Sequence, residues 1–148
     1  MIVPSAWLSL GNAPQYVPTL NAIESQYGLP QNLLCAVALQ ESSFNPSAVN
    51  ASSGATGMFQ LLPQYYPGAG ADWQTDAATA AQALLGYYNQ FGNWQDALAA
   101  YNWGPGNLTS SGASSLSQLP SETQGYVTNI VSNVPVSGPF VSVTNAVA

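Results

Sequence analysis

The sequence contains no lysine, arginine or histidine among its 148 residues, and its six acidic residues give a formal net charge of −6. Proteins that bind nucleic acid neutralise its phosphates with Lys and Arg, so this composition argues against nucleic acid as a partner. Attachment to an anionic membrane surface is disfavoured for the same reason. We therefore expect neither nucleic acid nor a membrane among the partners.

Cysteine is almost absent, since Cys35 is the only one. No intrachain disulfide can form, and Cys35 is the only one of the usual zinc ligands, Cys and His, in the chain. The six acidic residues are too scattered for a calcium loop. A lone cysteine in an apolar segment usually packs as a small hydrophobe, and without His the Cys35 thiol has no ordinary activating base. We expect no metal and no cofactor.

Long apolar runs are also missing, although 47% of the residues are hydrophobic. No run approaches the ~18 residues of a transmembrane helix. The first ten residues, MIVPSAWLSL, have no basic region, so they do not read as a secretory signal. The length fits one domain. We predict an N-terminal extension over residues 1–14, a folded domain over 15–134 and a tail over 135–148.

What the sequence does have is helical periodicity. Segment 31–42 is apolar on nearly all sides, which predicts a central, buried helix. Residues 109–118 are rich in serine and predict a linker. Strand signals are few, so the pattern favours an all-α fold or a helix-dominated α+β fold. Apolar spacing predicts helices over Pro18–Tyr27 and over 31–42. Capping residues predict two more, one from an N-cap at Thr75 to Phe91 and one from a cap at Asn93 to Gly104. A last helix is predicted to begin at Ser121, which has the spacing of a capping box with Gln124.

One acidic residue, Glu41, stands near the end of the apolar segment 31–42. In a helix it shares a face with Leu34 and Val37. Burial and the negative end of the helix dipole both raise the pKa of a carboxyl group, and the chain has no cationic side chain to oppose them. A carboxyl group that keeps its proton near neutral pH is a useful general acid. The alternative is a glutamate that reaches solvent from a frayed helix end.

Three motifs accompany Glu41 in a fixed order. The Glu41-Ser42 pair leads into FNPSA at 44–48, then GATGMFQLLP at 54–63, then AYNWG at 100–104, and later Tyr126. This order resembles the catalytic domain of soluble-type lytic transglycosylases, relatives of goose-type lysozyme, across roughly residues 16–133. The resemblance implies that 15–134 is a helical, lysozyme-like catalytic domain with a substrate cleft.

The resemblance also implies roles for individual residues, with Glu41 as the catalytic acid and base. Asn50 stands where family members often carry Ser, and Leu62 where Met is common. Local alternatives exist as well: Gln60 would satisfy nearby backbone groups, Tyr101 would pack on Leu98, and Tyr126 would pack in the core. The substrate-binding residues implied by the resemblance are Ser42, Asn50, Met58, Gln60, Leu62, Tyr101, Asn102 and Tyr126.

The chemistry implied by the resemblance needs one carboxyl group. The glutamate protonates the leaving oxygen, and the same residue then takes a proton from the C6 hydroxyl of N-acetylmuramic acid, which closes a 1,6-anhydro ring. Most glycosidases use two carboxyl groups, and Asp72 and Asp76 are the nearest candidates here for a second one.

The resemblance predicts an enzyme that cleaves the MurNAc-β-1,4-GlcNAc bond of peptidoglycan, with glycan strands as its partner. It would act at the bacterial cell wall, in the periplasm, outside the cell or on a virion, as a monomer or as one domain of a larger protein. Two alternatives stay open. One is a hydrolytic muramidase, and the other is a non-catalytic glycan-binding component of a virion or secretion apparatus.

Overall fold

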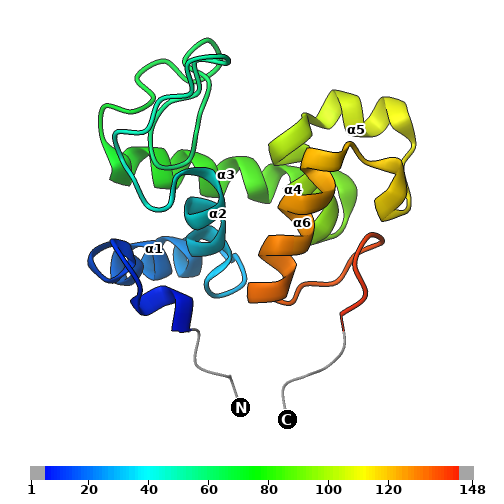
Figure 1. Ribbon diagram of the computed structural model, residues 1–148, viewed down its shortest axis with the longest axis horizontal. Coiled ribbons are helices and arrows are strands. Elements are labelled where there is room, and N and C mark those ends of the chain that lie inside the picture. Colours follow the sequence, from blue (N-terminus) through cyan, green and yellow to red (C-terminus); the bar gives the residue numbers. More distant parts are fainter. Residues whose placement is uncertain (1–5, 144–148) are drawn as a thin grey trace. The chain divides into compact units, whose positions relative to one another are not determined.

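The computed structural model describes residues 6–143, and six α-helices lie within them (Figure 1). The same residues contain no β-strand, only isolated bridges between Val49 and Thr56 and between Thr56 and Leu61. The all-α prediction is therefore confirmed. No helix of this described part is both long and apolar enough to cross a membrane. Within it the chain forms two compact parts, residues 6–82 and residues 83–143.

The first part is built around α2, Leu33–Ser42. The six residues Leu33–Ala38 are all buried, as the apolar sequence of this segment predicts. Helix α1, Ala13–Tyr27, packs against α2 and against the short 3-10 helix η1, Ala6–Ser9. Helix α3, Trp73–Phe91, begins in this part. The Cys35 thiol is buried within α2, and this burial, together with Glu24, raises its pKa.

The beginning of α2 is capped by a side chain from another helix. The N-cap residue Asn32 has φ 72° and makes no side-chain cap. Instead, Glu24 of α1 accepts hydrogen bonds from the backbone N–H groups of Asn32 at 2.8 Å, Leu34 at 2.9 Å and Cys35 at 3.2 Å. The Asn21 amide donates a further bond at 2.8 Å. A carboxylate thus meets the N–H groups and positive dipole of a helix start.

The segment 43–72 joins α2 to α3 and rises above both in Figure 1. It is held by backbone hydrogen bonds: Gly57 N donates to Ala48 O at 2.7 Å, and Thr56 and Leu61 pair in both directions at 2.9 and 3.1 Å. Residues 57–60 form the turn between Thr56 and Leu61, closed by Gln60 N donating to Gly57 O at 3.2 Å. We call residues 57–60 the motif turn.

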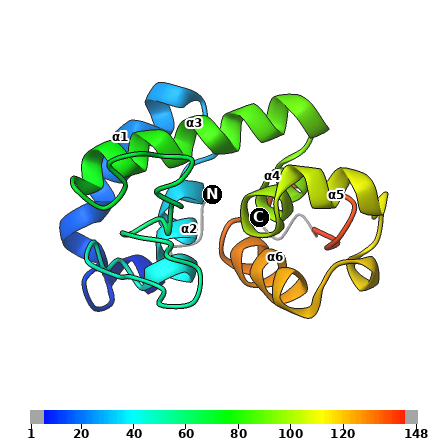
Figure 2. The ribbon, with the colours of Figure 1, turned by 90° about the horizontal axis from the view of Figure 1, so that it is seen from above.

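The second part contains the end of α3 and the remaining helices. Helix α4, Trp94–Trp103, packs against α5, Pro105–Ser111, and against α6, Ser121–Asn133, as Figure 2 shows. A 3-10 helix, η2, covers Leu116–Gln118. The buried side chains of α6 follow helical spacing and include Thr123, Tyr126, Val127, Ile130 and Val131.

Residues 136–141 of the predicted tail are fixed to α4 by Gln95, whose side chain is fully buried. Its Nε2 donates to the carbonyl oxygens of Val136 and Val141, both at 2.8 Å. Its Oε1 accepts from the N–H groups of Phe140 at 2.9 Å and Val141 at 2.8 Å. Residues 144–148 of the tail lie outside the described residues.

Several predicted helix ends are wrong. Helix α1 begins at Ala13, not at Pro18, because Pro14 fits the first turn and the helix continues through Pro18 without the bond that its missing N–H would donate. Thr75 is not an N-cap: α3 starts at Trp73, and the Asp72 carboxylate accepts from Thr75 N and Oγ1. The Asn93 cap is confirmed, since its side chain accepts from Asp96 N at 2.8 Å.

The predicted capping box at Ser121 and Gln124 is also wrong. Pro120 precedes α6 without a side-chain cap, and Gln124 Nε2 donates to Leu119 O at 2.8 Å. A capping box does occur, but between Ser115 and Gln118 of η2. The predicted linker 109–118 is therefore partly helical, since it contains the end of α5 and all of η2.

Candidate active site

Glu41 lies in the last turn of α2 and is half-buried. Two left-handed residues follow the helix, Ser43 at φ 55° and Phe44 at φ 60°. Their N–H groups bond to Leu39 O at 3.0 Å and Ala38 O at 3.3 Å, and the Phe44 ring is buried. Such backbone in non-glycine residues costs roughly 1–3 kcal/mol each and gathers at functional sites. The chain turns sharply here, and the buried Phe44 fixes the end of the helix that carries Glu41.

Ser42 connects this helix end to the motif turn. Its hydroxyl donates to the Met58 carbonyl oxygen at 2.8 Å and accepts from Asn45 N at 3.0 Å. A glycan contact for Ser42 stays a prediction, but the hydroxyl already has protein partners. The residue's evident role is to hold the motif turn against α2.

Gln60 occupies the end of the motif turn at φ 52°, and its side chain is half-buried. Its Nε2 donates to Gly57 O at 2.9 Å and to Ala48 O at 3.2 Å. Because both acceptors are carbonyl groups, the orientation of the amide is fixed. Its Oε1 accepts no hydrogen bond from the described residues, so it remains available as an acceptor. The local role of Gln60 and a glycan-binding role are therefore compatible.

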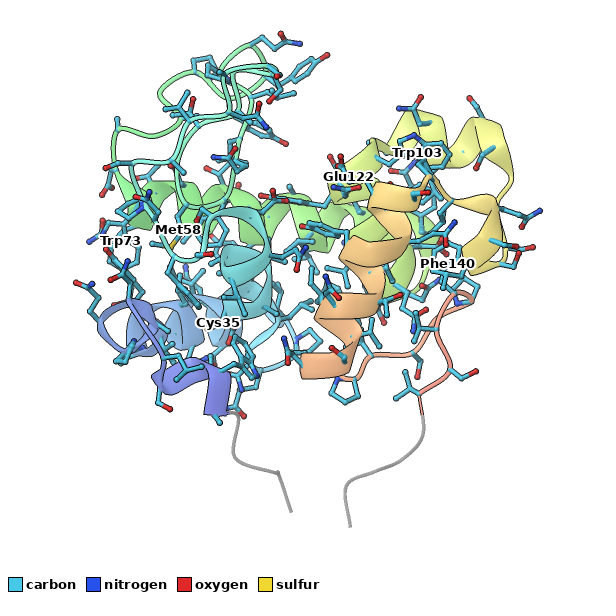
Figure 3. All side chains as sticks on the ribbon, in the orientation of Figure 1. Cys35, Met58, Trp73, Trp103, Glu122 and Phe140 are labelled. Atoms are coloured by element: carbon cyan, nitrogen blue, oxygen red, sulfur yellow. The ribbon has the colours of Figure 1, made fainter. Side chains whose placement is uncertain are left out.

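The other predicted residues of the first part differ in exposure. Met58 is fully buried (its position is labelled in Figure 3), so its side chain fits core packing better than contact with a substrate. Asn50 is exposed, and its Oδ1 accepts from Ser52 N at 2.9 Å and Ser53 N at 3.2 Å. Leu62 is half-buried. Glu41 is thus joined to the motif turn through Ser42, whereas Asn50 lies out on the loop.

Three predicted residues lie in the second part. Tyr101 and Asn102 are half-buried on α4, and Tyr126 is buried on α6. The Asn102 amide connects the two helices: its Nδ2 donates to Glu122 Oε2 at 3.0 Å, and its Oδ1 accepts from Thr123 Oγ1 at 2.8 Å. Figure 3 labels Glu122 at the start of α6. Two helices of the second part that pack against each other, α4 and α6, therefore carry Tyr101, Asn102 and Tyr126.

Asp76, which the sequence analysis named with Asp72 as the nearest candidate for a second carboxyl group, is buried in the first turn of α3. Its Oδ2 accepts from Gly70 N at 2.9 Å. Burial raises the pKa of Asp76, the nearby Asp72 adds to the rise, and the Gly70 N–H opposes it. The exposed Asp72 differs, because the Thr75 hydroxyl lowers its pKa. Nothing in the spacing of the sequence predicts the burial of Asp76.

Residues 18–123 match the family model of the transglycosylase SLT domain. The chain belongs to this family. The predicted resemblance is thereby confirmed, and Tyr126 lies just beyond the matched residues. The soluble lytic murein transglycosylase of Escherichia coli K12 is 31% identical over 128 residues, which cover 70% of this chain and 20% of that protein.

Solved structures agree with this SLT assignment. The 70 kDa soluble lytic transglycosylase of Escherichia coli has a TM-score of 0.68 and 29% identity over 80% of this chain and 23% of its own. Its complex with bulgecin A has a TM-score of 0.68 and 28% identity over the same shares. An inactive Glu-to-Gln variant of Slt from Pseudomonas aeruginosa has a TM-score of 0.67 and 25% identity over 78% and 22%. The SLT chain spans about a fifth of the length of these relatives.

Proposed function

We propose that this SLT domain cleaves the MurNAc-β-1,4-GlcNAc bond of bacterial peptidoglycan, with Glu41 as its general acid and base. The observation that carries the proposal is the place of Glu41 at the fixed end of a buried helix, in a chain without a cationic side chain. Such a setting favours the protonated form of a carboxyl group. The names of the relatives support the reaction class, and the inactivity of the Glu-to-Gln variant supports an essential glutamate.

In the proposed reaction Glu41 donates its proton to the glycosidic oxygen while the bond from C1 of MurNAc to that oxygen breaks. The N-acetyl group of the substrate stabilises the positive charge that develops at C1. The Glu41 carboxylate then takes the proton of the C6 hydroxyl, and the C6 oxygen bonds to C1. The products are a GlcNAc end and a 1,6-anhydroMurNAc end. No water is consumed, so the second carboxyl group that serves other glycosidases is not needed.

The remaining site residues are proposed to orient the glycan. Oε1 of Gln60 is an acceptor for an N–H or O–H group of a sugar. Ser42, Asn50 and Leu62 belong to the same part of the chain as Glu41. From the second part we propose Tyr101, Asn102 and Tyr126, with Asn102 and Tyr126 also serving the packing between α4 and α6.

The first test is Glu41→Gln, a nearly isosteric change that removes the proton donor. Turnover of purified peptidoglycan should fall by at least about 10²-fold, the lower range of general acid–base catalysis. Circular dichroism melts should stay close to those of the wild type. Asp96→Asn is the matched control, because Asp96 serves the start of α4 and contacts Asn93. Retention of more than about 1% of the activity in Glu41→Gln would contradict the assignment.

The product decides between the proposed reaction and its alternatives. Mass spectrometry of muropeptides released by the wild type should show anhydro ends, lighter by one water than hydrolysed ends. Hydrolysed ends alone would identify a muramidase. Binding to the wall without any released product would identify a non-catalytic glycan-binding module.

A further inference from the structure

We infer that Asp76 is a positioning residue for the proposed reaction, because it fixes the motif turn that carries Gln60. The inference rests on the proposed function, but its structural basis lies entirely within residues 42–76. Asp76 is buried at the start of α3, and neither the motifs nor the family match assigns it a role.

The contacts join three segments of the chain. Asp76 Oδ2 accepts from Gly70 N at 2.9 Å. Gly57, at φ 88°, lies so close that a Cβ atom there would stand 2.6 Å from Asp76 Oδ2 and 3.3 Å from Gly70 Cα. Real Cβ atoms essentially never approach other atoms to 2.6 Å. Glycine at position 57 therefore lets the motif turn rest directly on the Asp76 carboxyl group. We call Asp76, Gly70 and Gly57 the clasp.

The clasp leads directly to the proposed substrate acceptor. Gly57 O accepts from both Gln60 N at 3.2 Å and Gln60 Nε2 at 2.9 Å. On its other side the motif turn is held by Ser42, whose hydroxyl donates to Met58 O. The turn is thus fixed between α2 and α3. A shift of Gly57 would move the Gln60 amide, and small displacements of positioning groups can lower a rate about 10²-fold.

The clasp is also sensitive to ionisation. Asp72 lies one helical turn away, and Tyr66 lines the same small pocket. They are the other titratable groups that line this pocket, and neither is a cation. Because the pKa of Asp76 is raised in the fold, the folded chain binds this proton more tightly than the unfolded chain. The resulting stability is complete below the ordinary pKa of aspartate and is lost as pH rises through the raised pKa.

Two substitutions separate the hydrogen bond from the charge. Asp76→Asn keeps an oxygen that can accept from Gly70 N but cannot titrate. Asp76→Leu has a similar size but cannot accept. Initial rates on purified peptidoglycan should be measured from pH 4 to 8, with Asp96→Asn as the control for loss of a carboxyl group in the first turn of a helix.

We expect Asp76→Asn to keep kcat within about twofold of the wild type at the acidic end of this range and to lose less activity than the wild type as pH rises. Asp76→Leu should lower kcat about tenfold or more with little change in KM, because the turn is misplaced while most glycan contacts remain. Asp96→Asn should match the wild type. Equal pH profiles for the wild type and Asp76→Asn would overturn the role of the charge. An unchanged kcat in Asp76→Leu would overturn the positioning role.

A second readout does not depend on activity. In nuclear magnetic resonance spectra, the Gly70 N–H should be protected from exchange in the wild type and Asp76→Asn, and unprotected in Asp76→Leu. The Gln60 side-chain amide signals should shift only in Asp76→Leu. If the wild type fails to cleave peptidoglycan, the proposed function fails while these signals still decide whether the clasp positions Gln60. Unshifted Gln60 signals in Asp76→Leu would overturn the inference.

Discussion

At the scale of single residues, the carboxyl groups of Glu24, Asp76 and Glu41 have distinct tasks. Glu24 caps the N–H groups of α2, and Asp76 accepts the N–H group of Gly70. Glu41 lies at the opposite end of α2, where no capping need explains a carboxyl group. Helix dipoles favour an anion at the position of Glu24 and disfavour one at the position of Glu41. The two ends of α2 therefore carry a structural glutamate and a proposed catalytic glutamate.

The cap that Glu24 forms at the start of α2 predicts that Glu24→Gln lowers the free energy of unfolding. Glu24 accepts four hydrogen bonds through its two oxygens. Glutamine replaces one oxygen with an NH₂ group, which would face N–H donors and leave at least one buried donor unsatisfied. We expect a loss of about 1–3 kcal/mol in the free energy of unfolding, measured by urea titration at pH 7. Glu122→Gln, a substitution of an exposed residue, should change the free energy of unfolding by less than about 0.5 kcal/mol. Equal stability of the two variants would show that Glu24 is not the cap.

These residues show where sequence reasoning ends. Glu41, Gln60 and Tyr101 could be chosen because they belong to motifs with a fixed local spacing. The structural roles of Glu24 and Asp76 could not be predicted, because their partners belong to other segments. These partners are the start of α2 for Glu24, and Gly70 with Gly57 for Asp76. Their roles arise only when the segments pack together.

At the scale of elements, periodicity predicts the existence of helices better than their ends. Helix α2 was predictable because it is apolar on nearly all sides, and the Asn93 cap because its side chain meets a local N–H group. Thr75 failed as a cap because Asp72, three residues earlier, accepts from it instead. Helix α5 was missed because Gly104 and Pro105 end α4 and begin α5 at the same point.

The packing of the C-terminal segment against Gln95 predicts that an alanine at Gly138 destabilises the fold. A Cβ atom at Gly138 would overlap Gln95 Cβ and lie 2.7 Å from Gln95 Cγ and 2.8 Å from Asn93 Oδ1. Gln95 is held by its hydrogen bonds to Val136, Phe140 and Val141, so it has little room to move. Gly138→Ala should therefore lower the free energy of unfolding by about 1–3 kcal/mol.

Gly125 supplies the matched comparison. It lies inside α6, is exposed, and has no atom within 4 Å of an added Cβ. Gly125→Ala should raise the free energy of unfolding by about 0.5–1 kcal/mol, because alanine loses less backbone freedom in a helix. Urea titration of both variants gives the comparison. A Gly138→Ala protein as stable as Gly125→Ala would mean that the tail does not rest on Gln95.

At the scale of the whole molecule, the absence of cationic side chains changes how the fold responds to acid. Acid unfolding usually follows from the protonation of paired carboxylates and from repulsion between accumulated positive charges. This chain has no Lys, Arg or His, so its carboxylates have no side-chain ion pairs to lose. Protonation of all six acidic residues leaves the amino terminus as the only charge. Loss of side-chain ion pairs and accumulation of positive charge are therefore both excluded as causes of acid unfolding.

The shifted pKa values act in opposite directions on acidification. The raised pKa of Asp76 adds stability as pH falls through the raised value toward the ordinary one. The lowered pKa of Asp72 removes stability as pH falls from the ordinary value through the lowered one. Asp72 is exposed and bonds within a single helical turn, so solvent screens its contribution. The buried Asp76 should therefore have the larger effect, and the balance favours the acidic side.

We predict that the domain remains folded at pH 3 and melts cooperatively there. Circular dichroism melts from pH 2 to 8 measure this, with light scattering to separate unfolding from aggregation, because the net charge becomes small in acid. A collapse of Tm at pH 3 in soluble protein would contradict the prediction, and would mean that hydrogen bonds accepted by carboxyl groups hold this fold together.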